Sequence, residues 1–296
     1  MAAKAKYQLI SEALVNNEYL SVSLLCSTAK VSRSGYYYWK HNCNNTHLRD
    51  AESISLVKST HMRFHSKAGI RTIKMYLEFK HGIIMNTKKI QRIKKTYGIT
   101  TEIGRKNRYN TFNLAVQEDE TSPNLLNRQF CRNRPHEVYS TDITYLPYGA
   151  SNRAYLSAVK DLSSREIVHH CVSQNIRMEI ASEGLDKLLQ KLPNEIRSNL
   201  IIHSDQGSHY RHRGFRNLLR GYGVMQSMSR KGNCLDNAPI ESFFGHMKDE
   251  INLKSCKTFN DVKTMVNEYI RYYNEDRPQW TLKKMTPVEY RCHLNS

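Results

Sequence analysis

The segment VYSTDITYL, residues 138–146, marks the point where the chain changes from a helical to a strand-like pattern. Apolar and polar side chains alternate along it, and β-branched and aromatic residues dominate, which is typical of a strand. Further strands are predicted at 154–159, 167–172, 200–202 and 224–228, and helices at 178–192, near 215–220 and from Ala238. This order predicts a mixed α/β sheet that is covered by helices.

Upstream of this region, residues 7–41 have the pattern of short helices. Ser21 is placed to cap one helix and Ser32 the next, and Val31 leaves only a tight connection between them. Such a pair fits a helix-turn-helix, whose second helix reads DNA, and fits a plain helical hairpin equally well.

A second helical pair follows, with apolar positions between Ile70 and Phe79, a stop at Gly82, a new start at Asn86 or Thr87 and an end at Gly98. The exposed face of the later helix is predicted to carry five cations and no anion: Lys88, Lys89, Arg92, Lys94 and Lys95. Such a face favours contact with phosphates over a merely solvated surface.

The charge of the chain limits the choice of partner. Lys and Arg number 45 against 27 Asp and Glu, a formal net charge of +18, and residues 51–110 alone hold 14 basic and 3 acidic residues. This clustering favours a nucleic acid. No apolar run could span a bilayer and no secretory signal is recognisable, while the seven cysteines are scattered singly, so we expect a cytoplasmic protein with reduced thiols and no membrane partner.

Three carboxylates occupy places where the predicted layout would expose them to one cleft. Asp142 lies within the first strand, Asp205 follows a buried strand, and Glu241 lies in the first turns of the late helix, with 35 residues between it and Asp205. Polar groups at strand ends gather at the sheet edge where ligands bind. Converging carboxylates can hold a pair of Mg²⁺ ions, which activate a nucleophile and stabilise a leaving oxygen at a phosphodiester.

Other interpretations of these residues stay open at this stage. A lone aspartate in a strand-rich segment is most often a turn residue, and Glu241 could simply favour its helix N-terminus. Asp161 and Asp236 compete for the site, and we assign the first to a strand connection and the second to helix capping. A zinc site is disfavoured because no Cys-x-x-Cys pair accompanies the loose cluster Cys26, His41, Cys43 and His47, or the pair His61 and His65.

Three segments carry a resemblance to a known family: STDITY at 140–145, HSDQGS at 203–208 and DNAPIESFF at 236–244. They resemble the signatures of bacterial DDE transposases, specifically the second reading-frame protein (OrfB) of the IS3 insertion-sequence family, IS150 subgroup. The closing residues YN at 273–274, RP at 277–278 and MTPVEY at 285–290, and the upstream VSRSGYY at 31–37, fit the same family. Family positions differ at Tyr139, Gln206, His209 and Gln279, and none of these changes removes a carboxylate.

The resemblance implies an RNase H-like α/β catalytic core preceded by all-helical modules. The implied domains are a helix-turn-helix module at 1–47, a basic DNA-binding module at 48–110, a linker at 111–134, the catalytic core at 135–258 and a helical extension at 259–296. Asp142, Asp205 and Glu241 become ligands of two Mg²⁺ ions per site, with Mn²⁺ as a substitute. Arg33 and Lys248 join the five helix cations as DNA contacts, although Lys248 is equally well read as an ordinary exposed lysine.

The implied activity is metal-dependent nicking at the ends of a DNA element, followed by attack of the freed 3′-OH on target DNA. The implied partners are double-stranded DNA, further copies of the chain on that DNA and the upstream-frame OrfA protein, in a bacterial cytoplasm at the nucleoid. The main rival is a non-catalytic DNA-binding protein such as a decayed transposase acting as a repressor. A different RNase H-like nuclease is disfavoured by the paired N-terminal helical modules and by the Arg277-Pro278 motif.

Overall fold

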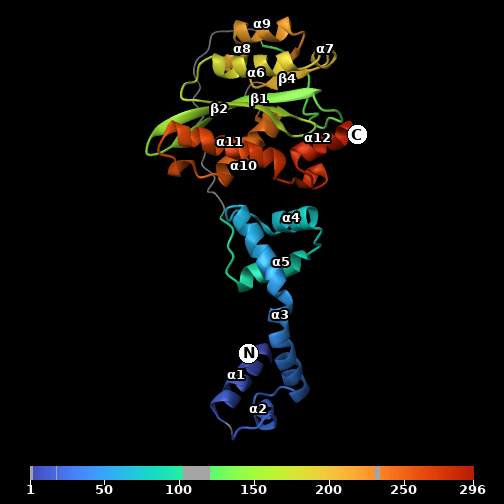
Figure 1. The fold of residues 1–296 in the computed structure, drawn as a ribbon, viewed down its shortest axis with the longest axis vertical. Helices are drawn as coiled ribbons and strands as arrows, with labels where there is room; N and C mark the ends of the chain where they lie inside the picture. Colours follow the sequence, from blue (N-terminus) through green and yellow to red (C-terminus); the bar gives the residue numbers. More distant parts are fainter. Residues whose placement is uncertain (1–2, 18, 103–120, 231–233) are drawn as a thin grey trace. The chain divides into compact units, whose positions relative to one another are not determined.

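The computed structural model describes residues 3–17, 19–102, 121–230 and 234–296 (Figure 1). The chain divides into two compact units, residues 1–73 with 85–100, and residues 74–84 with 101–296. Each unit is described by itself below. Among the described helices, none has the length and apolar character needed to cross a membrane.

The first unit begins with three helices, α1 (Ala3–Asn16), α2 (Val22–Thr28) and α3 (Arg33–Arg63). Both predicted caps are confirmed: the Ser21 side chain accepts from the Leu24 amide and the Ser32 side chain accepts from the Gly35 amide. A small core of Ile10, Cys26 and Tyr36 joins the three helices. The segment that we predicted as a helix-turn-helix is therefore a helical unit with its own hydrophobic core.

Helix α3 is longer than the sequence pattern suggested, because it continues without interruption from Arg33 to Arg63. The boundary that we predicted at 47/48 falls inside this helix and is corrected. No glycine or proline occurs between Tyr36 and Lys67, so nothing in the backbone chemistry ends the helix at that point.

Helices α4 (Ile70–His81) and α5 (Thr87–Thr96) end as predicted. Gly82 and Gly98 both have positive φ, near 65° and 62°, where a glycine is favoured. Beyond each glycine the next amide turns back to the last turn of its helix, from Ile83 to Leu77 and from Ile99 to Lys94. Asn86 caps α5 by accepting from the Lys88 amide.

The second unit is built on a five-stranded sheet in the order β3-β2-β1-β4-β5. The strands are β1 (Val138–Tyr148), β2 (Asn152–Asp161), β3 (Ile167–Ser173), β4 (Ile201–Ser204) and β5 (Met225–Met228). The first three form an antiparallel meander, and β4 and β5 then run parallel to β1. The mixed α/β sheet predicted from the sequence is confirmed, as are all five strands.

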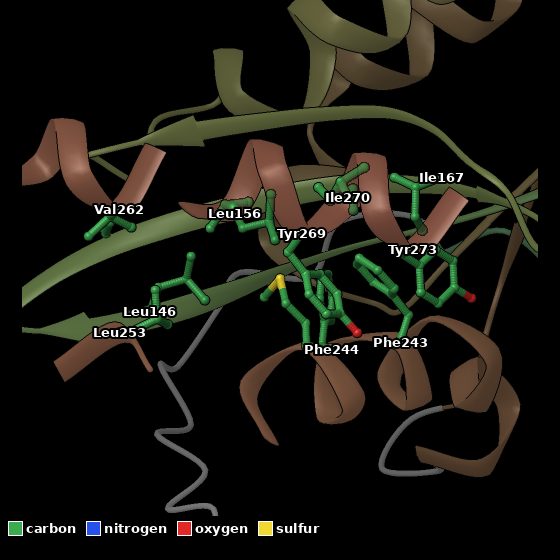
Figure 2. Close-up of a cluster of buried hydrophobic side chains, with 14 of the residues drawn as sticks. Leu146, Leu156, Ile167, Phe243, Phe244, Leu253, Val262, Tyr269, Ile270 and Tyr273 are labelled. Carbon is green, nitrogen blue, oxygen red and sulfur yellow. The ribbon is translucent and has the colours of Figure 1, made fainter. Parts of the chain in front are cut away.

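Helices cover both faces of this sheet (Figure 1). One face packs against α6 (Glu179–Lys191) and α9 (Arg213–Gly221), in a core that includes Tyr139, Leu185 and Phe215. The other packs against α10 (Ala238–Glu250) and α11 (Phe259–Glu275), and Figure 2 shows its aromatic side chains between helices and strands. Shorter helices are α7 (Asn194–Arg197) and α8 (Ser208–Arg211), and the chain ends in α12 (Pro287–Asn295). Since side chains alternate along β1, Leu146 and Tyr148 identify the face that also carries Asp142 as the α10 face.

The linker predicted at 111–134 needs correction in its described part, from residue 121 onward. Leu126 is 1% exposed and packs with Val138 and Leu162. The Leu125 amide donates to the Ser227 hydroxyl, and the Met228 amide donates to the Pro123 carbonyl. This segment therefore belongs to the fold of the second unit, although it forms no helix or strand that periodicity could reveal.

The closing motif near the C-terminus has a structural explanation. The Asn274 side chain both accepts from the Ile167 amide and donates to the Ile167 carbonyl, which ties α11 to the first residue of β3. Arg277 forms an ion pair with Glu250, the last residue of α10, at 2.7 Å. The predicted helical extension at 259–296 is thus helical, but α11 also supplies part of the main core.

Candidate active site

Asp142 lies in the middle of β1, on the face of the sheet that α10 covers. Its Oδ1 accepts from the Ile143 amide at 2.7 Å, which fixes the carboxylate close to the strand. Burial raises the pKa of Asp142 well above the ordinary range, and the charges of Asp205 and Glu241 raise it further. The charges of both other predicted carboxylates thus act on Asp142.

Asp205 follows directly on the last residue of β4. Its Oδ1 accepts from the Gly207 amide at 2.8 Å, and a Cβ atom at position 207 would lie only 2.8 Å from the same oxygen. A glycine is thus required for this close approach. Burial raises the pKa of Asp205, against the opposing effect of the Gly207 amide bond.

Glu241 is the fourth residue of α10, and its side chain is exposed. Partial desolvation raises the pKa of Glu241, and the charge of Asp205 raises it further. The charged form is thus disfavoured in all three carboxyl groups, which come from three separate segments of the chain. A nearby cation would relieve this cost, because it favours ionised carboxylates.

Lys248 lies two turns after Glu241 on α10. Its Nζ donates to the Thr144 hydroxyl at 2.6 Å and lies 4.9 Å from the centre of the Tyr145 ring. Burial lowers the pKa of Lys248 to about 8, and the charge of Asp142 partly opposes this effect. The lysine is thus a half-buried cation beside the first carboxylate, and the interpretation as an ordinary exposed lysine is wrong.

The donor set fits hard divalent cations. Mg²⁺ and Mn²⁺ prefer carboxylate oxygens, and each of the three carboxyl groups keeps at least one oxygen with no hydrogen bond in the described part of the chain. Among the residues that the structure describes, no three His, Cys, Asp or Glu side chains are already arranged as a metal cage.

The two competing aspartates have structural roles. Asp161 organises the β2–β3 connection as predicted, because its oxygens accept from the Ser163 amide and hydroxyl and from the His136 amide. We had predicted that Asp236 caps α10, and this prediction is wrong. It lies in a short 3-10 turn before the helix and forms ion pairs with Arg128 and Arg230, both at 2.8 Å.

The predicted DNA-contact face of α5 is less free than its sequence suggested. Asp50 on α3 forms ion pairs with Lys89 at 3.0 Å and with Arg92 at 2.5 Å, and Lys94 donates to the Ala68 carbonyl. The helix itself carries no anion, as expected, but a residue 39 positions upstream of Lys89 supplies one from α3. The remaining predicted contacts, Arg33, Lys88 and Lys95, have exposed side chains.

The zinc interpretation finds no support in the described residues. Cys26 lies in the hydrophobic core of the first unit. The His61 ring is engaged with the carbonyls of Ala68 and Thr100. The side chains of Cys43 and His47 lie outside the described residues.

Two family models match parts of the second unit. Residues 132–234 match the integrase core domain family, and residues 241–294 match a second family with the same description. The chain therefore contains an integrase core domain, which comprises the sheet and the three carboxylates.

Relatives extend the match beyond that domain. The InsK protein of insertion sequence element IS150 from Escherichia coli K12 is 34% identical over 93% of this chain and 94% of its own length. A transposase-like protein of Haemophilus influenzae is 37% identical over 73% of this chain and 98% of its own. The transposase for insertion sequence element IS904 of Lactococcus lactis is 32% identical, over 71% and 81%. The chain belongs to the family of insertion-sequence transposases and is a DDE polynucleotidyl transferase.

Among solved structures, the catalytic core domain of HTLV-2 integrase in complex with magnesium matches 53% of this chain and 97% of its own, at 15% identity and a TM-score of 0.39.

Proposed function

We propose that Asp142, Asp205 and Glu241 together hold two Mg²⁺ ions, for which Mn²⁺ can substitute, and that with them this transposase nicks element ends and joins them to target DNA. The supporting observation is electrostatic. The charges of Asp205 and Glu241 raise the pKa of Asp142, and the charge of Asp205 raises the pKa of Glu241. Bound ions would supply Lewis-acid activation of the attacking oxygen and stabilisation of the leaving oxygen.

The reaction has two phosphoryl-transfer steps. In the first, a water oxygen attacks a phosphorus at the element end, the P–O3′ bond breaks, and a free 3′-OH remains. In the second, that 3′ oxygen attacks a phosphorus of the target, and the target's own P–O3′ bond breaks. Each step transfers one proton away from the attacking oxygen and leaves one hydroxyl on the departing strand.

The residues of this chain orient the reactants. Asp142 and Asp205 each have one carboxylate oxygen fixed by a backbone amide, that of Ile143 and that of Gly207, which leaves the second oxygen for a cation. Lys248 supplies a cation beside Asp142, in a place where it could contact the phosphate being transferred. We include Arg33, Lys88 and Lys95 as contacts to the DNA backbone, because all three are exposed.

The proposal extends to the assembly in which the reaction takes place. Joining two element ends to one target requires more than one active site, so we propose several copies of the chain on paired ends of double-stranded DNA. We further propose the upstream-frame OrfA protein as a partner, and the nucleoid of a bacterial cytoplasm as the place of action.

Strand joining on duplexes that carry the ends of the encoding element tests the proposal. Wild type is expected to produce nicked and joined DNA only with Mg²⁺ or Mn²⁺. Asp205→Asn should lower the rate at least 100-fold, since even partners behind a metal ligand commonly cost 10–100-fold. Asp249→Asn, an exposed acid on the same helix as Glu241, is the matched control and should retain activity. DNA binding without metal-dependent cleavage by wild type would favour the non-catalytic alternative.

A further inference from the structure

Two buried polar side chains precede Asp142 and Asp205 along the chain. Ser140 precedes Asp142 by two residues on β1, and His203 precedes Asp205 by two residues on β4. Side chains two apart in a strand share a face, so Ser140 and Asp142 point to the same side of the sheet. Ser140 and His203 are also directly paired in the parallel β1–β4 register. The two strands thus present a matched polar pair just before their carboxylates.

Both members of this pair bind the two residues that precede α10. The Ser140 hydroxyl donates to the Asn237 side-chain oxygen at 2.7 Å, and His203 Nε2 lies 2.9 Å from the Asp236 carbonyl. A carbonyl only accepts, so Nε2 is the donor, and Nδ1 of a neutral ring then accepts from the Ser227 hydroxyl at 2.9 Å. All of these side chains are at most 2% exposed.

Asp236 is also fixed through its own side chain. The Asp236 carboxylate accepts from Arg128, from the side-chain amide of Asn124, and from both the guanidinium and the backbone amide of Arg230. Two residues after Asn237, the Pro239 carbonyl accepts from the buried Lys160 of β2 at 2.8 Å. The beginning of α10 is therefore attached to β1, β2, β4 and the segment before β1.

Glu241 lies only four residues after Asn237, with Pro239 between them. A proline in the first turn has a fixed φ, which limits how the helix can turn relative to its anchor. Fixing the Asp236–Asn237 pair on Ser140 and His203 thus fixes Glu241 relative to Asp142 and Asp205. A buried network of hydrogen bonds restricts the positions of its members, whereas three repelling carboxylates by themselves do not.

We propose that Ser140, His203, Asp236 and Asn237 form a buried cross-tie that sets the spacing of the three carboxylates and thereby the affinity of the site for divalent metal. These four are positioning residues, because none of them need touch the DNA or the ions. The inference rests on the proposed function, since it takes the three carboxylates to be the metal ligands.

Binding of Mn²⁺ to the full chain, followed by electron paramagnetic resonance of the free ion, tests the cross-tie. Ser140→Ala and Asn237→Ala each remove the same hydrogen bond. Each is expected to weaken Mn²⁺ binding 10–100-fold, the range typical of groups that orient metal ligands. The double variant should be no weaker than either single variant, because the bond can be lost only once. Ser140→Thr keeps the hydroxyl and should recover most of the affinity.

Ser163→Ala is the matched control. It also deletes a buried serine hydroxyl that forms a short hydrogen bond, here to Asp161 at 2.6 Å in the β2–β3 turn, and it should leave Mn²⁺ binding unchanged. Equal Mn²⁺ affinity for wild type and Asn237→Ala would overturn the cross-tie, and so would equal losses in Ser140→Ala and Ser163→Ala. Asp205→Asn separates the two proposals: unchanged Mn²⁺ binding in this variant would instead reject the carboxylate site itself.

Discussion

Asp205 and Asp236 are the same residue type in the same sheet unit, yet their surroundings act on them in opposite ways. Two guanidinium groups hold the pKa of Asp236 well below its usual range, whereas burial raises the pKa of Asp205. The Asp236 carboxylate is paired within the protein and stabilises the fold. The charged form of Asp205 is unfavourable, which is the condition expected of a group that binds a cation.

Substitution of Asp236 should therefore destabilise the protein. Asp236→Ala leaves Arg128 and Arg230 without their shared anion and removes several hydrogen bonds, so we expect the free energy of unfolding to fall by about 1.5–3 kcal/mol, the range for hydrogen bonds to charged groups. Chemical denaturation at pH 7 measures this change. Asp249→Ala, at an exposed position on α10, should change it by less than about 0.5 kcal/mol.

The same residue gives a pH dependence with a defined sign. Because the folded-state pKa of Asp236 is depressed, its contribution to stability is present above the ordinary aspartate range near pH 4 and is lost as the pH falls below it. The difference in unfolding free energy between wild type and Asp236→Asn should thus shrink when the pH is lowered from 6 to 2. A difference that stays constant over this range would show that the ion pairs do not stabilise the fold.

At the level of elements, local chemistry predicted most of the fold. Alternation along β1 and serine or asparagine caps before α2, α3 and α5 correctly located those elements. Two features were missed because they depend on contacts far apart in sequence: the packing of Leu126 in the core and the pairing of Asp50 with α5. The continuation of α3 through position 47 was missed although no glycine or proline interrupts that stretch.

The candidate site shows the same division. Strand ends and a helix start predicted where Asp142, Asp205 and Glu241 would lie, but the family signatures were needed to select them over Asp161 and Asp236. Nothing in the sequence pattern indicated that Ser140 and His203 are neighbours, because the β1–β4 register follows only from the folded sheet. Their place in the signature segments, two residues before each aspartate, is a signal that could have identified them.

The packing of the segment before β1 can be tested by a pair of neighbouring leucines. Leu126 is 1% exposed and Leu125 is 43% exposed. Leu126→Ala should lower the free energy of unfolding by about 2–5 kcal/mol, the cost of a cavity in a core, while Leu125→Ala should have a much smaller effect. Denaturant unfolding of both variants provides the measurement. Similar effects would mean that this segment is the loose linker originally predicted.

At the scale of the whole chain, only part of the large positive charge is available to contact DNA phosphates. The formal net charge is +18, but Asp50 already neutralises part of the basic face of α5. Counterion release by DNA depends on cations that reach phosphates rather than on the total charge. The salt dependence of binding should therefore separate exposed lysines from those that are paired within the protein.

Lys88 and Lys89 are adjacent on α5 and form a natural comparison, since Lys88 is exposed and Lys89 pairs with Asp50. In a plot of log affinity for duplex DNA against log salt concentration, Lys88→Gln should reduce the slope by about 0.9, the value of one phosphate contact. Lys89→Gln should reduce it by less. A larger reduction for Lys89→Gln would place the DNA contact on the paired lysine instead.

The raised pKa values of Asp142, Asp205 and Glu241 also have a consequence for the stability of the whole molecule. Burial raises all three, and neighbouring carboxylates raise those of Asp142 and Glu241 further, so the metal-free protein binds protons more tightly when folded. The contribution of these three groups to stability is then present at pH values below the ordinary carboxyl range and is lost as the pH rises above it. Divalent metal that binds the folded state should restore this stability.

Thermal unfolding at pH 8, with and without Mg²⁺, compares wild type with Asp142→Asn on this point. We predict that Asp142→Asn has the higher midpoint without metal, because one of the repelling charges is removed. We also predict that Mg²⁺ raises the midpoint of wild type more than that of the variant. A metal-free Asp142→Asn that is no more stable than wild type, together with equal responses to Mg²⁺, would contradict a shared carboxylate site.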